Sequence, residues 1–393
     1  MFLTGSELSS LRPCGCSGGQ LGGLEKRSAV FDSVEASRRL VVETGGLVQT
    51  DREQDLMKFR ILFEALKLLR YDVVHLTDQD FELATRLGLM AEQHGFEIID
   101  AATPDPPAVF AKRFAARGRD ITVNVLSIRN REPQAPEVPS VDILILPHYD
   151  PDLLKALVAQ ASDIECVVCP SDTDEPRLVS KPGEVPLVLT VGRFGRYICR
   201  LDVTIEERTG QPALRFESIP VQAKLPDNQV LLQLYRQYQQ LVGQSDLLEN
   251  YPRVPLPEKL AFTGSPACKR CHEYEYDQWS TKPHANALAS LVKAGSDRDP
   301  ECVVCHVVGM EYQTGYVSED KTSHLKDVGC ENCHGPGSEH VQTYGQVGTK
   351  EPKMTCTKCH TPEKSTGFAG QEEEYMQKII HWREPATPGN VKN

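Results

Sequence analysis

Hydrophobic and polar positions follow two alternating patterns along the first 227 residues. Short apolar runs of strand type recur at residues 40–42, 73–76, 121–126, 141–146, 164–168, 187–191 and 197–203. Between several of these runs, apolar residues recur at the i, i+3, i+4 and i+7 spacing of amphipathic helices, over residues 56–69, 81–94 and 151–161. Because strands and helices alternate, the pattern predicts a layered α/β sandwich.

The pattern changes after residue 227. Residues 228–243 carry one apolar helical stripe, and a proline-rich stretch with Pro252, Pro255 and Pro257 follows. Beyond this stretch strand-type runs stop, and glycine, proline, cysteine and histidine dominate. We therefore predict an α/β domain at 1–227, a helix with a linker at 228–261, and a mainly α-helical domain at 262–393.

Composition narrows the choice of partners. The 393 residues carry a net charge of -12, which argues against nucleic acid and anionic membrane surfaces and favours a basic protein partner. No run of about 18 apolar residues occurs, so no transmembrane helix is expected. No secretory signal is visible after Met1.

Cysteine and histidine concentrate near the carboxy terminus. Eight of the 13 cysteines follow residue 265 and form four Cys-x-x-Cys-His repeats: Cys268–Cys271–His272, Cys302–Cys305–His306, Cys330–Cys333–His334 and Cys356–Cys359–His360. Cysteines one helical turn apart can bond both vinyl groups of one porphyrin, and the adjacent histidine then reaches the iron. Zinc knuckles also use Cys-x-x-Cys pairs, but they do not require the histidine. The repeats predict four covalently bound haem c groups.

Four further histidines lie in the same region. His284, His324, His340 and His381 are candidates for the second axial ligands of the four irons, the alternative being ordinary polar surface residues. Apolar residues are few here, so the porphyrins are expected to form the core. We therefore predict that this domain does not fold without haem.

The spacing around two of the repeats resembles a known family. Cys268-x-x-Cys271-His272-Glu-x-x-Tyr-x-x-Trp279, followed by His284, and Gly329-Cys-Glu-Asn-Cys-His-Gly-Pro-Gly-Ser-Glu-His340 resemble the cytochrome c-554 family. Its members are tetrahaem cytochromes best known from nitrifying bacteria, where they accept electrons from hydroxylamine oxidoreductase.

The resemblance implies a set of distal ligands that cross between the repeats. Carried over by position, His284 ligates the haem on His334, His340 the haem on His272, and His381 the haem on His360. The second haem of the family can lack a distal ligand. Here His324 is the candidate partner of His306; without it the iron is open to a small ligand such as nitric oxide.

The amino-terminal segment Pro13-Cys14-Gly-Cys16-Ser-Gly-Gly is similar to the start of 5'-nucleotidase-like proteins of the calcineurin-type metallophosphatase fold. Enzymes of this fold hold two metal ions with Asp, Asn and His. Here Gly46 stands where an acid is expected, Asp78-Gln79-Asp80 replaces Gly-Asn-His, and only His148 occupies a ligand-like place. The resemblance implies a metallophosphatase-like domain without catalytic metals, so phosphoesterase activity is not expected.

The remaining cysteines allow several interpretations. Cys14, Cys16, Cys166 and Cys169 form one or two disulfides in an oxidising compartment, or a replacement metal or redox site together with His148, or they stay buried thiols. Cys199, on a predicted strand, is interpreted as an unpaired buried thiol.

The leading hypothesis is a multihaem c-type cytochrome that transfers electrons between extracytoplasmic redox proteins. Because haem c is attached outside the cytoplasm, a periplasmic or similar location is expected, with a leader upstream of this sequence. Two alternatives remain. One is a haem enzyme that reduces or oxidises a small nitrogen compound at an open iron, and the other is an adaptor in a redox complex.

Overall fold

The computed structural model describes residues 1–13, 19–100, 109–116, 119–127, 140–148, 150, 152, 164–181, 184–257, 260–350 and 356–382. The chain divides into two compact units. The amino-terminal unit comprises Met1–Cys14 and Gly19–Tyr238, and the carboxy-terminal unit includes Gln239–Asn393. This division falls within helix α5 (Gln229–Gln244) rather than before it. The sequence-based boundaries at 227 and 261 therefore remain proposals.

A six-stranded sheet forms half of the amino-terminal unit. Its strands are β1 (Phe2–Thr4), β2 (Val41–Glu43), β3 (Val73–Leu76), β4 (Glu97–Asp100), β10 (Tyr197–Ile205) and β11 (Pro212–Pro220), in the order β11-β10-β1-β2-β3-β4. Strands β1 to β4 run parallel, whereas β10 is antiparallel to β1 and forms a hairpin with β11. The carboxyl ends of four parallel strands therefore meet at one edge.

A five-stranded sheet forms the other half. It contains β5 (Val109–Ala116), β6 (Arg119–Ser127), β7 (Ser140–Ile145), β8 (Cys166–Cys169) and β9 (Leu187–Thr190), in sequence order, and only β5 is antiparallel to its neighbour. Val42 and Val73 of the first sheet share one buried cluster with Val123, Ile143 and Val168 of the second. The two sheets thus pack face to face, which confirms the predicted layered α/β fold.

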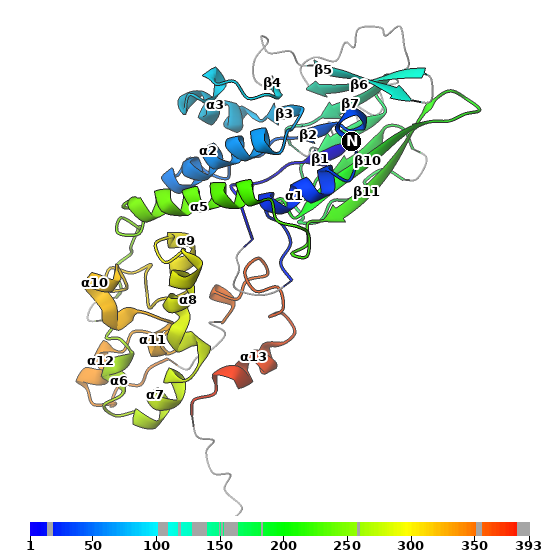
Figure 1. Ribbon diagram of the computed structural model, residues 1–393. Coiled ribbons are helices and arrows are strands. Elements are labelled where there is room, and N and C mark those ends of the chain that lie inside the picture. Colours follow the sequence, from blue (N-terminus) through cyan, green and yellow to red (C-terminus); the bar gives the residue numbers. More distant parts are fainter. Residues whose placement is uncertain are drawn as a thin grey trace, which may run out of the picture. The chain divides into compact units, whose positions relative to one another are not determined.

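Three helices accompany the strands: α1 (Leu24–Phe31), α2 (Glu53–Leu68) and α3 (Asp78–Arg86) (Figure 1). Phe31 of α1 packs on Phe2 of β1, with ring centroids 5.5 Å apart. Helix α3 begins with a capping box in which Thr77 and Asp80 bond each other's backbone N–H groups. It ends earlier than the pattern over 81–94 predicted, because Gly88 adopts a left-handed conformation with φ of 76°. The helix predicted at 151–161 lies almost entirely outside the described residues.

The carboxy-terminal unit is mainly helical, as predicted. Its helices are α6 (Ser265–Cys268), α7 (Glu273–Ser280), α8 (Ala287–Ala294), α9 (Pro300–Val303), α10 (Glu319–Thr322), α11 (Cys330–His334), α12 (Ser338–Gln342) and α13 (Glu372–Ile379). Short 3-10 turns η3 (Pro283–Asn286), η4 (Ser323–Leu325) and η5 (Cys356–Lys358) lie between them. Across the described part of the chain, no helix is long and apolar enough to cross a membrane.

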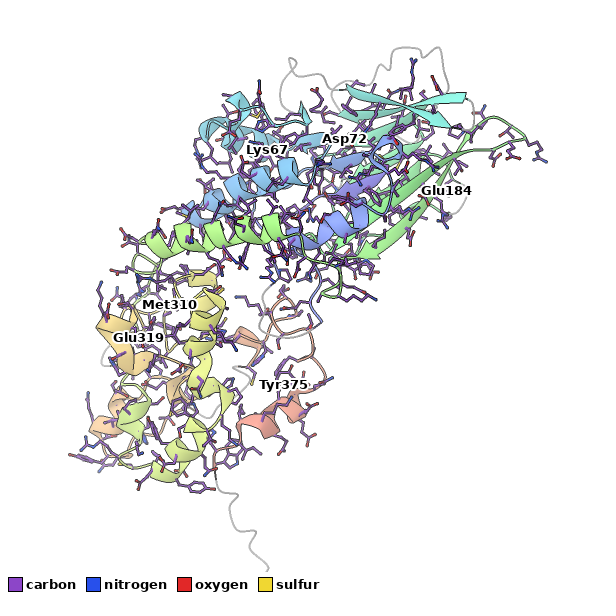
Figure 2. The ribbon with its side chains drawn as sticks, in the orientation of Figure 1. Lys67, Asp72, Glu184, Met310, Glu319 and Tyr375 are labelled. Atoms are coloured by element: carbon purple, nitrogen blue, oxygen red, sulfur yellow. The ribbon has the colours of Figure 1, made fainter. Side chains whose placement is uncertain are left out.

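The carboxy-terminal unit also contains a small apolar core of its own. Its buried members are Leu248, Leu288, Leu291, Val303, Val307, Val308, Met310, Tyr316 and Leu325; Met310 is labelled in Figure 2. Val303 lies within the second Cys-x-x-Cys-His repeat, and Val307 and Val308 follow it directly. The chain therefore supplies more of the core than composition predicted, although the whole unit remains short of apolar side chains.

Candidate haem-binding site

Each Cys-x-x-Cys-His repeat forms about one helical turn. The backbone N–H of His272 donates to the Cys268 carbonyl at 2.9 Å, and that of His360 donates to the Cys356 carbonyl at 2.8 Å. The third repeat is helix α11 itself, and the second begins in α9 and continues with a bond from His306 N–H to the Val303 carbonyl at 2.8 Å. This geometry brings the two cysteines and the histidine of each repeat within reach of a single porphyrin.

Hydrogen bonds fix the orientation of several histidine rings. Nδ1 of His306 donates to the Ala287 carbonyl at 2.7 Å, and Nδ1 of His340 donates to the Val347 carbonyl at 2.8 Å. His381 bonds the Ile379 carbonyl through Nδ1 at 2.9 Å, and Nδ1 of His360 lies 3.0 Å from the Ser365 hydroxyl. A ligating histidine usually bonds the protein through Nδ1 and the metal through Nε2, and these rings are held through Nδ1 in the same way. The donor set therefore fits haem iron.

Three proximal histidines each face a second histidine. The ring centroids lie 5.9 Å apart for His272 and His340, 6.3 Å apart for His284 and His360, and 6.3 Å apart for His334 and His381. Imidazoles bound to opposite faces of one iron have this kind of separation. The first pair is the one that the family resemblance implied.

The other two pairs differ from the expectation, because His284 and His381 have exchanged partners. His284 faces His360 rather than His334, and His381 faces His334 rather than His360. Helix α8 begins directly after the turn that carries His284, and its Ala287 carbonyl accepts from His306. The same segment therefore serves the second and fourth repeats.

His324 is not brought to His306. Its side chain is exposed on η4, and its backbone carbonyl would lie 2.3 Å from a Cβ added to Gly264, the residue before α6. Gly264 itself has a φ of 81°, so only glycine fits this close approach without strain. Among the ring contacts of the described residues, none joins His324 to a proximal histidine. His306 is half-buried, and burial lowers its pKa.

The four repeats associate as two pairs. The side chains of Cys268 and Cys330 hydrogen-bond each other, as do those of Cys305 and Cys359. These thiols stand in for the thioether sulphurs of the haem-loaded protein. In the haem-free chain, the bond to Cys359 lowers the pKa of Cys305 to about 6. The first and third repeats, and likewise the second and fourth, are direct neighbours.

Aromatic side chains that the sequence did not single out surround the fourth repeat. Phe368 stacks on the His360 ring with the ring centroids 4.8 Å apart. Tyr375 of α13, labelled in Figure 2, meets the His360 ring edge-on at 5.5 Å. No motif signals them, because they follow the repeat at distances that only the fold sets.

In the amino-terminal unit, one carboxylate at the place of the expected metal ligands, that of Asp80, is engaged in internal hydrogen bonds. The Asp80 carboxylate accepts from the backbone N–H groups of Gly46 and Leu47 at 2.8 and 2.9 Å. His148, Asp78 and other polar residues line a cavity of about 570 Å³. Among the described residues, no three His, Cys, Asp or Glu side chains form a metal-binding group.

Buried charges beside this place neutralise one another. Arg27 of α1 donates to both carboxylate oxygens of Glu7 at 2.6 Å and to the Tyr71 hydroxyl at 3.1 Å. Thr4 connects Tyr71 to Glu43, whose pKa is raised well above its ordinary value by burial. The polar groups of this network therefore find most of their hydrogen-bond partners within the network itself.

Three cysteines of this unit are buried free thiols, as was predicted for Cys199: Cys166, Cys169 and Cys199. Residues three apart in a strand lie roughly 10 Å apart, so β8 geometry rules out a disulfide between Cys166 and Cys169. Burial raises the pKa of Cys169 to about 12. Cys14 and Cys16 lie outside the described residues.

The helical Cys-x-x-Cys-His turns and their histidine pairs define the class of the carboxy-terminal region, that of c-type cytochromes with covalently bound haem c. Residues 267–335 match the family model for "Cytochrome c554 and c-prime". Cytochrome c-554 of Nitrosomonas europaea is 32% identical over 136 residues, covering 30% of this chain and 55% of the relative. The chain thus spans about half the length of this curated relative. The resemblance of the region to the cytochrome c-554 family is confirmed.

Solved structures similar to the chain include the sulfate thiohydrolase SoxB of Thermus thermophilus, at a TM-score of 0.45 and 17% identity, covering 57% of this chain and 47% of that one. A 5'-nucleotidase precursor from the same species has a TM-score of 0.45 and 16% identity, with coverages of 75% and 67%. At these TM-scores, neither structure adds to the fold that the strand order already shows.

Proposed function

We propose that the protein is a tetrahaem electron carrier that works between extracytoplasmic redox proteins. The observation that carries this proposal is the pairing of His272 with His340, His284 with His360, and His334 with His381. Two histidines on one iron saturate its coordination and leave no place for a substrate, which favours electron transfer over catalysis.

The residues have distinct roles in this proposal. The eight repeat cysteines hold four haems, and the four following histidines, His272, His306, His334 and His360, are their proximal ligands. His340, His381 and His284 would supply the second histidine ligands of the first, third and fourth repeats respectively. Each haem supplies one-electron chemistry when bound. The protein's own part is to orient histidine rings through Nδ1 and to keep water from the half-buried ones.

The adjacent repeats suggest a route for electrons. Because one cysteine of the first repeat interacts with one of the third, and one of the second with one of the fourth, the haems of each pair would lie close enough for direct electron exchange. An acidic chain with a net charge of -12 favours a basic partner. The amino-terminal domain docks such a partner or positions the haem domain.

A second candidate function depends on the iron of His306. Because His324 lies exposed against Gly264, it must move to become a ligand. Should the sixth position of that iron be open, it would accept a small nitrogen compound, and the protein would be a haem enzyme.

Electron paramagnetic resonance of the oxidised protein distinguishes the two functions. Only low-spin signals that nitric oxide leaves unchanged support a carrier with four six-coordinate irons. A high-spin signal that disappears with nitric oxide supports the enzyme. The variant H324Q is the matched control: a new high-spin signal in H324Q identifies His324 as a ligand, and an unchanged spectrum excludes it.

A further inference from the structure

A buried carboxylate lies beside the first and third repeats. Glu331 is only 4% exposed and is the second residue of the third repeat. Its carboxylate accepts from the backbone N–H groups of Thr263 at 2.9 Å, Gly264 at 2.7 Å and Gly337 at 2.7 Å. The Gly264 carbonyl in turn accepts from the Cys268 thiol at 3.9 Å. Three backbone N–H groups hold this carboxylate in place, so a fixed negative charge faces this pair of repeats.

A lysine takes the corresponding place beside the second and fourth repeats. The Lys364 ammonium lies 3.9 Å from the Cys305 sulphur and 3.0 Å from the Glu301 carbonyl. Lys364 follows the fourth repeat in the sequence and contacts the second, so its ammonium group lies beside both repeats. A positive charge therefore faces this pair.

We propose that Glu331 and Lys364 set the reduction potentials of the two haem pairs in opposite directions. Reduction adds one electron, delivered by a redox partner, to a ferric iron, and so lowers the positive charge at the haem by one. A neighbouring carboxylate opposes this change and lowers the potential, whereas a neighbouring ammonium group favours it and raises the potential. Electrons on the carrier are thereby biased towards the second and fourth repeats. This inference rests on the proposed tetrahaem function.

Burial makes Glu331 more effective than a surface charge. It is held by backbone donors with little water around it. Lys269, the second residue of the first repeat, instead pairs with Asp277 at 2.9 Å while both side chains are about half exposed. Exposed charges are screened by water and salt. Lys269 therefore serves as a matched control, within a repeat but solvated.

The test is a spectroelectrochemical titration of the haem-loaded full chain, comparing the wild type with K364Q, K364R, E331Q and K269Q. K364Q should lower two of the four potentials by an amount equivalent to about tenfold in the equilibrium constant, or about 59 mV for one electron. K364R keeps the charge and should restore the wild-type values. E331Q should raise the other two potentials, and K269Q should move none by a comparable amount.

Two results would overturn the proposal. One is that K364Q and K364R give the same potentials, which would show that the charge is irrelevant. The other is that E331Q and K364Q shift the potentials in the same direction. Since E331Q can disturb the backbone around Gly264, E331D, which keeps the charge, separates a folding effect from a charge effect.

Measuring the number of haems per chain distinguishes a failure of the proposed tetrahaem function from a failure of the charge proposal. A wild-type protein with fewer than four haems contradicts the proposed function, and the charge proposal with it. Four haems with potentials that the Lys364 variants leave unmoved contradict the charge proposal alone.

Discussion

Acidification should destabilise the amino-terminal unit through a single buried histidine. His75 lies on β3 with no solvent exposure, and its Nδ1 bonds the Thr44 carbonyl at 3.1 Å. Burial lowers its pKa from 6.5 to about 4, although the Thr44 bond and the Asp78 charge oppose this. His75 therefore binds a proton near pH 6.5 in the unfolded chain, but only near pH 4 in the folded unit. The contribution of neutral His75 to the free energy of unfolding is fully present above pH 6.5 and is lost as the pH falls towards 4.

The size of the effect follows from the same two values. A tenfold change in proton affinity is worth about 1.4 kcal/mol, so the interval between pH 6.5 and 4 amounts to about 3 kcal/mol. Between pH 7 and pH 4.5, the expected loss is about 2 kcal/mol. Glu43 and Asp80 act in the opposite sense, because burial raises their pKa values. The variant H75Q isolates the histidine, since both proteins share these carboxyl groups.

The assay is urea unfolding of the haem-loaded chain at pH 7 and pH 4.5, followed by far-ultraviolet circular dichroism, with the Soret band reporting on the haem unit separately. The wild type should lose about 2 kcal/mol more of its free energy of unfolding than H75Q does. If acidification lowers the free energy of unfolding of the wild type and of H75Q by the same amount, the reasoning is refuted.

The remaining predictions concern buried charge, haem ligation and folding. R27M leaves Glu7 buried without its partner and should cost about 3–5 kcal/mol of stability; E7L/R27M should recover most of this in thermal unfolding, and a double variant as unstable as R27M would contradict the pair. H381Q should turn one low-spin signal high-spin and shift the nuclear resonances of the His334 ring; a response confined to the His360 ring would mean that the pairing is wrong. Replacing all eight repeat cysteines with alanine should leave the carboxy-terminal unit unfolded while the sheets persist, and native helix content there by hydrogen exchange would disprove this.

Local chemistry made much of this protein predictable from its sequence. The β-branched runs that became β3, β7 and β8 fill the space between two sheets, and such burial leaves a clear apolar pattern. The Cys-x-x-Cys-His repeats are equally local, because one helical turn contains the whole attachment chemistry. Strand β1 was missed since three residues, Phe2–Thr4, are too few for a periodic signal.

Long-range contacts account for what the sequence could not predict. His284 and His360 are far apart in the chain, and their pairing depends on how α8 and η3 pack beside the second repeat. Ligands carried over by position from a family contain no such information, and the ring contacts of His284 and His381 differ from that assignment. The haem-attachment pattern does not single out Glu331 or Lys364 either, because Glu331 occupies one of its variable positions and Lys364 lies outside it. Their roles emerge only from the sulphur and backbone atoms that they contact.

The most direct test of the central claim is the intact mass of the purified, denatured protein, combined with alkylation of its remaining thiols after reduction. The account predicts a mass excess of four haems that survives denaturation, and five alkylated cysteines, the number left when eight of the 13 are bonded to haem. A smaller mass excess, or more than five alkylated thiols, would mean that fewer than four haems are attached and would contradict the account.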